Sequence, residues 1–210
     1  MRLKDKELEK IACFKVGKFG NEELDEDDFK NVEEINISNR KFSGEEKNIS
    51  LQELTLFPNI KRMSLQYFKI DDSIAEILSG LSNLESLQLA SCKLYLKSEI
   101  RNFNLKNLEL NSCNIRDYST IYAPNVLAII GSDNIRLDRI KGKENIERMY
   151  LQNSKVKGFR SVTDCSRLLE LNLDGSTVDD SKFLEEIKSE IRVSQKEEYL
   201  PCLLYTSPSP

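Results

Sequence analysis

The 210-residue sequence contains no histidine. Histidine is the usual general base beside a serine or cysteine nucleophile and the commonest protein ligand of zinc and iron, so its absence argues against most hydrolases and metalloenzymes. No two acidic residues sit in an apolar frame that would raise the pKa of one carboxyl group, as catalysis by carboxylates requires. We therefore expect a protein that is not an enzyme, with no catalytic residues, no metal ligands and no cofactor.

Long apolar runs are also missing. No stretch approaches the roughly 20 apolar residues that a membrane-spanning helix needs. The first ten residues, MRLKDKELEK, are charged from the second residue and lack the apolar core of a secretory signal. We expect no membrane insertion, and a cytoplasmic protein if Met1 is the true start.

Positive charge is not in excess, and the cysteines do not form motifs. The formal net charge is −4 and the pI is about 5.2, with lysines and acidic residues interspersed. Because no basic field is available to hold a phosphate backbone, we expect no nucleic-acid partner. Apart from Cys202, the cysteines are Cys13, Cys92, Cys113 and Cys165, with no C-x-x-C pair and no dense spacing. They are expected to be reduced and buried.

An internal repeat dominates what is present. Each copy has an apolar residue at a position that we number zero, apolar residues at +3, +5 and +10, and a small or sulfur-bearing residue at +8. Four copies fit fully: Leu84, Leu87, Leu89, Cys92 and Leu94; Leu105, Leu108, Leu110, Cys113 and Ile115; Ile146, Met149, Leu151, Ser154 and Val156; and Leu168, Leu171, Leu173, Ser176 and Val178.

Three weaker copies complete the array. They are Val32, Ile35, Ile37 and Phe42; Ile60, Met63, Leu65, Phe68 and Ile70; and Leu127, Ile130, Ile135 and Leu137. The seven units thus begin at residues 32, 60, 84, 105, 127, 146 and 168. An asparagine directly precedes position zero in five of them, at Asn31, Asn59, Asn83, Asn104 and Asn145. This second register mark indicates that the periodicity is not accidental.

The spacing predicts a parallel sheet built from one short strand per unit. Apolar residues at +3 and +5 alternate with outward residues at +4 and +6, which is the period of a strand with one buried face. Such a strand is too short to be stable alone, so successive units must stack, and the return segments supply the other wall of the core. A small side chain at +8 fits the buried turn beside its backbone amides and carbonyls.

The pattern, for example LESLQLASCKL and LKNLELNSCNI, resembles the leucine-rich-repeat family. The intervals near 22 residues and the phrase Asn114-Ile115-Arg116-Asp117 are most similar to the bacterial internalin-like subtype. The resemblance implies an α/β solenoid with a parallel concave β-sheet and short helices or irregular segments on the convex side. Three departures stand out: the first two units are long, the fifth has Ser132 at +5, and the asparagine ladder usual at +8 is absent.

We divide the chain into three parts. Residues 1–30 are predicted to be an N-terminal capping segment, with Leu8, Ile11, Phe14 and Val16 and an acidic run at residues 22–29 that reads as a solvated face. Residues 31–200 are the repeat array of about seven to eight units. Residues 201–210 end in CLLYTSPSP, which resembles the conceptual translation of a transposase sequencing adapter. We expect them to be a disordered read-through tail, with the real C-terminus missing.

Return segments carry helix signals in two places. Asp71-Asp72-Ser73 precedes a stripe of apolar residues at Ile74, Ile77, Leu78 and Leu81, and Asp179-Asp180-Ser181 precedes a second at Phe183, Leu184 and Ile187. An aspartate or serine at such a position caps a helix by accepting backbone hydrogen bonds. We therefore expect short convex helices there, an irregular return from residues 136 to 142, and one more strand around Ile191 and Val193.

The concave face is the predicted binding surface. Outward positions +4 and +6 include Gln66, Gln88, Glu109, Asn111, Asp133, Tyr150, Gln152, Asn172 and Asp174. Tyr150 is the expected anchor, because tyrosine offers a large contact area for little loss of rotamer entropy. We expect a monomer that binds a protein or peptide partner across this face.

Three alternatives stay open at this stage. The repeats could be the recognition arm of a larger effector or enzyme whose catalytic part is missing, or of a surface adhesin whose signal peptide is missing. They could also be a structural array with no specific partner. A longer reading frame at either end would favour the first two.

Overall fold

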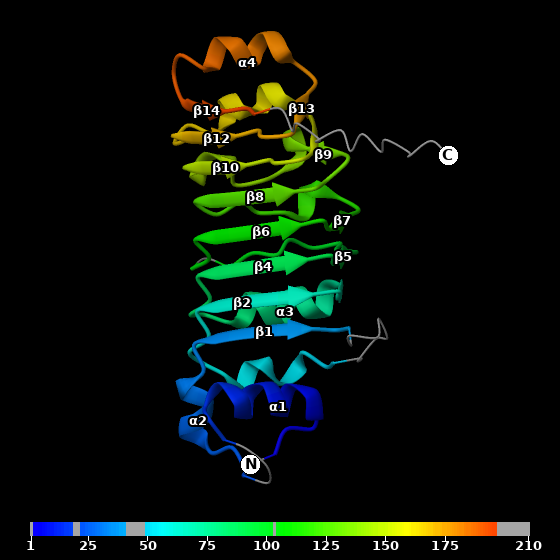
Figure 1. Ribbon diagram of the computed structural model, residues 1–210, viewed down its shortest axis with the longest axis vertical. Helices are drawn as coiled ribbons and strands as arrows, with labels where there is room; N and C mark the ends of the chain where they lie inside the picture. The colour runs from blue at the N-terminus through cyan, green and yellow to red at the C-terminus, as the bar shows by residue number, and fades with distance from the viewer. Residues whose placement is uncertain (1, 19–21, 41–48, 103, 197–210) are drawn as a thin grey trace, which may run out of the picture.

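The computed structural model describes residues 2–18, 22–40, 49–102 and 104–196, and it shows a solenoid of stacked repeats (Figure 1). Eight strands form one parallel sheet in the order β1-β2-β4-β6-β8-β10-β12-β14. Their bounds are β1 Glu34–Ser38, β2 Arg62–Gln66, β4 Ser86–Ala90, β6 Asn107–Asn111, β8 Val126–Ile130, β10 Arg148–Tyr150, β12 Glu170–Asn172 and β14 Arg192–Ser194. Each repeat thus contributes one strand, and the predicted fold class is confirmed.

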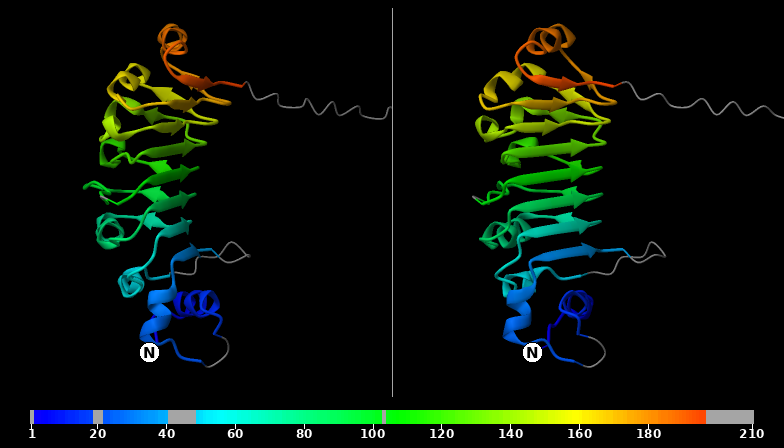
Figure 2. Two further views of the ribbon diagram at one scale, coloured as in Figure 1. Left: turned by 90° about the vertical axis from the view of Figure 1, so that its left-hand side faces the viewer. Right: turned by 60° about the vertical axis from the view of Figure 1, so that its left-hand side comes forward.

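The opposite wall carries the return segments. Two narrow parallel ribbons run there in the orders β3-β5-β7 and β9-β11-β13. Figure 2 shows this wall and its helical turns on the side away from the eight-stranded sheet. The elements are β3 Lys69–Ile70, β5 Lys93–Leu94, β7 Asn114–Ile115, β9 Ile135–Arg136, β11 Lys155–Lys157, β13 Thr177–Val178, helices α3 Asp72–Gly80 and α4 Ser181–Ile187, and 3-10 turns η1 Gln52–Leu56, η2 Tyr118–Thr120, η3 Leu137–Arg139, η4 Lys143–Asn145 and η5 Phe159–Asp164.

Both predicted helices are present with the predicted type of cap. The Asp71 carboxylate accepts a hydrogen bond from the Ile74 backbone N–H at the start of α3, and Asp180 does the same for Phe183 in α4. These caps satisfy backbone donors that have no partner inside the helix. The return from residues 136 to 142, predicted to be irregular, contains the 3-10 turn η3 and a left-handed Gly142. The strand expected around Val193 is β14.

The register of the fifth unit was predicted wrongly. In the sheet, Leu127 is the partner of Leu108, and Ile129 is the partner of Leu110. Leu127 therefore occupies position +3 instead of position zero, the unit begins at Pro124, and Ser132 lies at +8 instead of +5. The strand reads Val-Leu-Ala-Ile-Ile, so every residue is apolar. An uninterrupted apolar run has no alternation to fix which residues face inward.

With this correction, the residue at +7 is left-handed in the six units that begin between residues 60 and 168. The six residues have φ between +50° and +68°, and they are Tyr67, Ser91, Ser112, Gly131, Asn153 and Gly175. This conformation turns the chain out of the concave strand at the same point in each unit. Only two of the six are glycines, so four units adopt a conformation that costs about 1–2 kcal/mol for a residue with a side chain.

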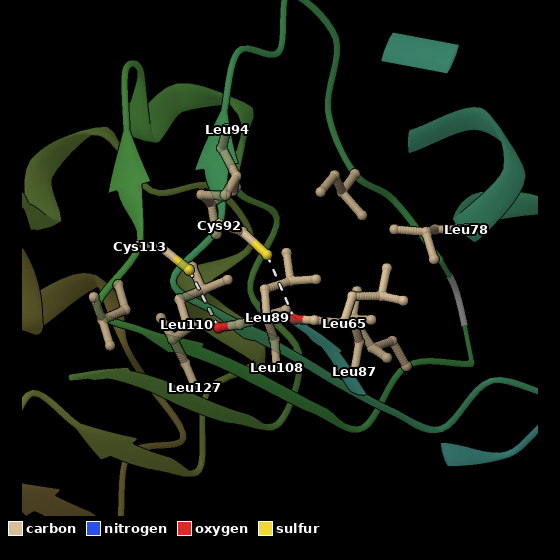
Figure 3. Packing of buried hydrophobic residues seen from close by; sticks show 14 of the residues in the cluster. Leu65, Leu78, Leu87, Leu89, Cys92, Leu94, Leu108, Leu110, Cys113 and Leu127 are labelled. Atoms are coloured by element: carbon tan, nitrogen blue, oxygen red, sulfur yellow. Dashed lines mark hydrogen bonds between the residues drawn. The ribbon is translucent and has the colours of Figure 1, made fainter. Parts of the chain in front are cut away.

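The small residues at +8 line the turn that follows and bond to the neighbouring repeats. Cys92 Sγ lies 3.4 Å from the Leu65 carbonyl oxygen, and Cys113 Sγ lies 3.2 Å from that of Leu89 (Figure 3). Serines replace the cysteines further along. The backbone N–H of Ser154 donates to Ser176 Oγ at 2.9 Å, and that of Ser132 donates to Ser154 Oγ at 3.0 Å. The Ser132 hydroxyl also bonds the buried Tyr118 hydroxyl.

The asparagines before position zero connect successive repeats at the entry to the strand. Asn59 Nδ2 donates to the Lys30 carbonyl oxygen at 2.9 Å, and Asn83 Nδ2 donates to that of Pro58 at 2.8 Å. Asn104 makes the equivalent bond to Ser82. Each bond runs from one repeat to the residue two before position zero in the previous repeat. The asparagines therefore satisfy loop carbonyls that the parallel sheet does not reach.

Two helices lie at the N-terminal end of the sheet: α1, Lys6–Lys15, and α2, Glu26–Asn31 (Figure 1). Leu8 and Ala12 of α1 are buried and belong to the same apolar core as the repeats. Phe14 is 72% exposed, contrary to its expected place among the covering residues, because the helical period that turns Leu8 and Ala12 inward turns it outward. The acidic run forms the capped first turn of α2. The predicted Phe42 and the predicted tail at 201–210 lie outside the described residues.

Candidate binding surface

The concave face consists of the residues at +2, +4 and +6 of each unit, whose side chains point away from the core. The +2 row is Glu34, Arg62, Ser86, Asn107, Val126, Arg148, Glu170 and Arg192; the +4 row is Asn36, Ser64, Gln88, Glu109, Ala128, Tyr150, Asn172 and Ser194; the +6 row is Ser38, Gln66, Ala90, Asn111, Ile130, Gln152, Asp174 and Lys196. Because the strands are parallel and in register, each row crosses the sheet as a line of neighbouring side chains.

Eight of the nine predicted residues lie on this face, namely Gln66, Gln88, Glu109, Asn111, Tyr150, Gln152, Asn172 and Asp174. Asp133 does not. It follows Ser132 in the turn after β8 and is exposed there at position +9. The error has the same cause as the register error, because counting from Leu127 instead of Pro124 moved every later residue of the unit by three positions.

The first half of the concave face is internally paired. Ser64 Oγ donates to Gln88 Oε1 at 2.8 Å, and Gln88 Nε2 donates to Glu109 Oε1 at 2.9 Å, so three consecutive strands are joined along the +4 row. In the +2 row, the Arg62 guanidinium lies 3.0 Å from the Glu34 carboxylate. The predicted residues Gln88 and Glu109 are therefore already hydrogen-bonded, to each other and, through Gln88, to Ser64.

The adjacent +1 positions form an edge row of opposite charges. Lys61 Nζ lies 2.8 Å from Glu33, and Lys106 Nζ lies 3.1 Å from Glu85. All four side chains are substantially exposed, so each pair contributes little to stability. The two ion pairs neutralise the charges of these four residues at the +1 edge of the concave face.

The last strands form a second network, around Asp174. Its carboxylate accepts hydrogen bonds from the Lys196 backbone N–H at 2.7 Å and the Ser194 hydroxyl at 2.8 Å, and Asn172 Nδ2 lies 3.2 Å from it. These hydrogen bonds, first that of the Lys196 amide, hold the pKa of Asp174 below its ordinary value. Asp174 therefore joins the end of β12 to β14 and the residues after it, with Asn172 beside it in the same network.

Between these two networks lies an apolar row that the sequence analysis missed. Val126, Ala128 and Ile130 of β8 occupy the three outward positions and are partly exposed, while Leu127 and Ile129 between them are fully buried. A signal for this row was present in the sequence. Aligning the Gly131-Ser132 dipeptide with Gly175-Ser176 places the fifth unit in its true register.

β10 and the residues after it border the apolar row with polar groups that are unpaired among the described residues. Arg148 lies beside Val126, and Tyr150 lies beside Ala128 in the parallel register. Within the described part of the chain, no ion pair or side-chain hydrogen bond is recorded for Arg148, Tyr150 or Gln152. Their hydrogen-bonding capacity is open to an external group.

The described cysteines are outside the three rows of this surface, and Cys13 of α1 is half-buried instead of buried as expected. Cys92, Cys113 and Cys165 are buried in the core, and burial raises the pKa of Cys165 to about 12. No group of three or more cysteine, aspartate or glutamate side chains within the described ranges could hold a metal ion. No helix among those residues is long and apolar enough to cross a membrane. What the concave face offers is hydrogen bonding, charge and apolar contact.

Comparison with solved structures finds the same architecture in bacterial proteins. An internalin (inlF) from Listeria monocytogenes superposes with a TM-score of 0.63 at 20% sequence identity, covering 91% of this chain and 55% of that protein. Internalin C2 (inlC2) from the same organism gives a TM-score of 0.55 at 13% identity, covering 91% of this chain and 93% of that one. This chain thus spans about half the length of the inlF structure. No protein-family model and no curated protein sequence matches the chain.

At these identities the likeness concerns the fold and not the partner. The eight-stranded parallel sheet and the few helices match the internalin architecture that the repeat pattern resembles. The chain therefore has the leucine-rich-repeat solenoid fold seen in the Listeria internalins.

Proposed function

We propose that this chain is a non-catalytic scaffold that binds a protein or peptide partner on its concave face. The observation that carries the proposal is the row Val126, Ala128 and Ile130, which places partly exposed apolar side chains on an otherwise polar sheet. Rows of apolar side chains exposed to solvent are a feature of interaction surfaces. Contact between apolar side chains and water is unfavourable, and a partner that buries them removes that contact.

The scaffold around this row supports binding without rearrangement. The underlying residues Leu108, Leu127 and Met149 are buried in a continuous core, so the outward side chains stand on a rigid base. Tyr150 adds an aromatic ring next to the apolar row, and its hydroxyl group has no hydrogen bond to another described residue. Such preorganised aromatic contacts supply much of the binding energy at protein interfaces. The same face would serve a free-standing module or the recognition arm of a larger protein.

The test is site-specific photocrosslinking in extracts of the source cells. A benzophenone amino acid replaces Tyr150 in one variant and the exposed convex residue Lys182 in the other. We expect a protein adduct at position 150, suppressed by excess unlabelled wild-type protein but not by excess Ile130→Asp protein. Adducts that form equally at position 182, or that both competitors suppress equally, would contradict binding on the concave face.

A further inference from the structure

Two networks of paired side chains flank the apolar row of the concave face. From β1 to β6 they are the Ser64, Gln88 and Glu109 chain and the ion pair of Arg62 with Glu34. From β12 to β14 the network is that of Asp174 and its partners. The surface between the two networks is the docking strip: Val126, Ala128 and Ile130 of β8, with Arg148, Tyr150 and Gln152 of the next repeat.

The docking strip has an apolar centre with polar borders. The three β8 side chains extend from position +2 to +6, about 13 Å along the strand at roughly 3.3 Å per residue. Asn107, Glu109 and Asn111 border them on the β6 side. An apolar centre surrounded by polar groups is the usual arrangement of a protein interface, and this length accommodates one or two large apolar side chains of a partner.

The charge at one end of the docking strip is positive and has no ion pair with any residue that the structure describes. Arg148 occupies the same +2 position as Arg62, which pairs with Glu34 of the preceding strand. The residue preceding Arg148 in the row is Val126, so Arg148 has no acid on that side. Glu170 follows it in the row, yet the two are not ion-paired.

The next residue of this row adds to the positive charge. Arg192 follows Glu170 and is also without an ion pair within the described residues. The row therefore ends with two guanidinium groups and one carboxylate, on a chain whose formal net charge is −4. A guanidinium group binds a carboxylate through two parallel hydrogen bonds, which makes an acidic group its best complement.

We infer that the docking strip binds a peptide segment of a partner protein that carries an apolar side chain and, near it, a carboxylate. This inference rests on the proposed function and specifies the partner of the same surface. The apolar side chain lies on Val126, Ala128 and Ile130, and the carboxylate pairs with Arg148. Tyr150 covers the flank of the apolar side chain, and Gln152 bonds the backbone of the segment at the other end of the strip.

The experiment uses a phage library of random 12-residue peptides, selected on the full chain. Enriched peptides are synthesised with a fluorescent label, and their affinities are measured by anisotropy. Two matched pairs of variants separate the docking strip from the rest of the face: Arg148→Ala against Arg62→Ala at +2, and Ile130→Asp against Ala90→Asp at +6. Circular dichroism confirms that each variant is folded, and Ile130→Ser replaces Ile130→Asp if the latter unfolds.

We expect enriched peptides to contain an aspartate or glutamate within a few residues of a large apolar residue. Arg148→Ala and Ile130→Asp should each weaken binding about tenfold or more, equivalent to about 1.4 kcal/mol. Arg62→Ala and Ala90→Asp should change it less than twofold. An Arg148→Glu variant should recover binding when the acidic residue of the peptide is replaced by lysine.

The outcomes separate this inference from the proposed function. Binding that Arg62→Ala and Ala90→Asp weaken but Arg148→Ala and Ile130→Asp do not would keep the concave face and overturn the docking strip. Enriched peptides without acidic residues would overturn the assignment to Arg148. No enrichment over the Arg148→Ala, Ile130→Asp double variant would overturn the docking strip, and binding that none of the four substitutions affects would overturn both proposals.

Discussion

Replacing Ser112 by glycine is expected to stabilise the protein. Ser112 occupies the left-handed +7 position with φ of +50°, a conformation in which its Cβ approaches the following carbonyl oxygen. The equivalent residue of the next repeat is Gly131, with φ of +66°. The Ser112 backbone N–H bonds the Ile130 carbonyl oxygen at 2.8 Å, and glycine keeps that bond. Nothing in the turn therefore depends on the side chain apart from one exposed contact with Asn111.

The magnitude follows from two opposing effects. Relief of the left-handed strain is worth about 1–2 kcal/mol, whereas the greater freedom of glycine in the unfolded chain costs about 0.5–1 kcal/mol. The net stabilisation should be about 0.5–1 kcal/mol. A matched control is Ser82→Gly, since Ser82 is also exposed but has no positive φ. This control should lose about 0.5–1 kcal/mol, because only the entropic cost applies.

The assay is equilibrium unfolding in urea followed by far-UV circular dichroism. The comparison is between midpoints at an unchanged dependence on urea, because a changed slope would indicate altered cooperativity along the repeats. Ser112→Gly and Ser82→Gly should shift the midpoint in opposite directions. A loss of stability in Ser112→Gly as large as that in the control would refute the idea that the +7 turn is strained.

Three further predictions concern the core, a buried thiol and the N-terminal helices. Leu110→Ala should lower the free energy of unfolding by about 2–5 kcal/mol, because Leu110 is 1% exposed and the cavity would be only partly refilled; a loss under about 1 kcal/mol would contradict this packing. Cys165 should be alkylated by iodoacetamide at pH 8.5 far more slowly in the native protein than in urea, since burial raises its pKa to about 12. Equal alkylation rates, measured by mass spectrometry, would contradict the burial of this thiol. The backbone N–H of Asp28 and then the Lys18 ammonium lower the pKa of Asp25 to about 2, so the native state favours its ionised form. Its contribution to stability is present above the ordinary pKa of 3.8 and is lost as the pH falls through about 2. In thermal melts, Asp25→Asn should therefore be less stable at pH 7, with a difference that shrinks below pH 4 and disappears only below pH 2.

Alternation along the sequence was enough to place the strands wherever polar residues separate the apolar ones. In β4, Leu87 and Leu89 are fully buried and Gln88 between them points outward, as the spacing predicts. The aspartate caps of α3 and α4 were equally readable, because a cap depends on residues within one turn. These features are local, so one segment contains all the information that they need.

The sequence did not reveal which polar side chains of the concave face are already occupied. Gln88, Glu109 and Gln152 all hold outward positions of the repeat, yet the first two are hydrogen-bonded to each other, whereas the Gln152 side chain has no hydrogen bond to another described residue. The partners are 21 residues apart along the chain. Their contact exists only because the repeats stack in register, which spacing within a single unit does not describe.

The sequence by itself determined the repeat and the parallel sheet, because the apolar period of most units leaves one way to bury a short strand, and the resemblance of the pattern indicated the leucine-rich-repeat fold. The tertiary structure decided the face of β8, which the apolar period of its own strand leaves open. Its five consecutive apolar residues are compatible with either register, and pairing with Leu108 and Leu110 turns Val126, Ala128 and Ile130 outward. The candidate site depends on that choice, since shifting a strand by one residue exchanges its buried and exposed faces.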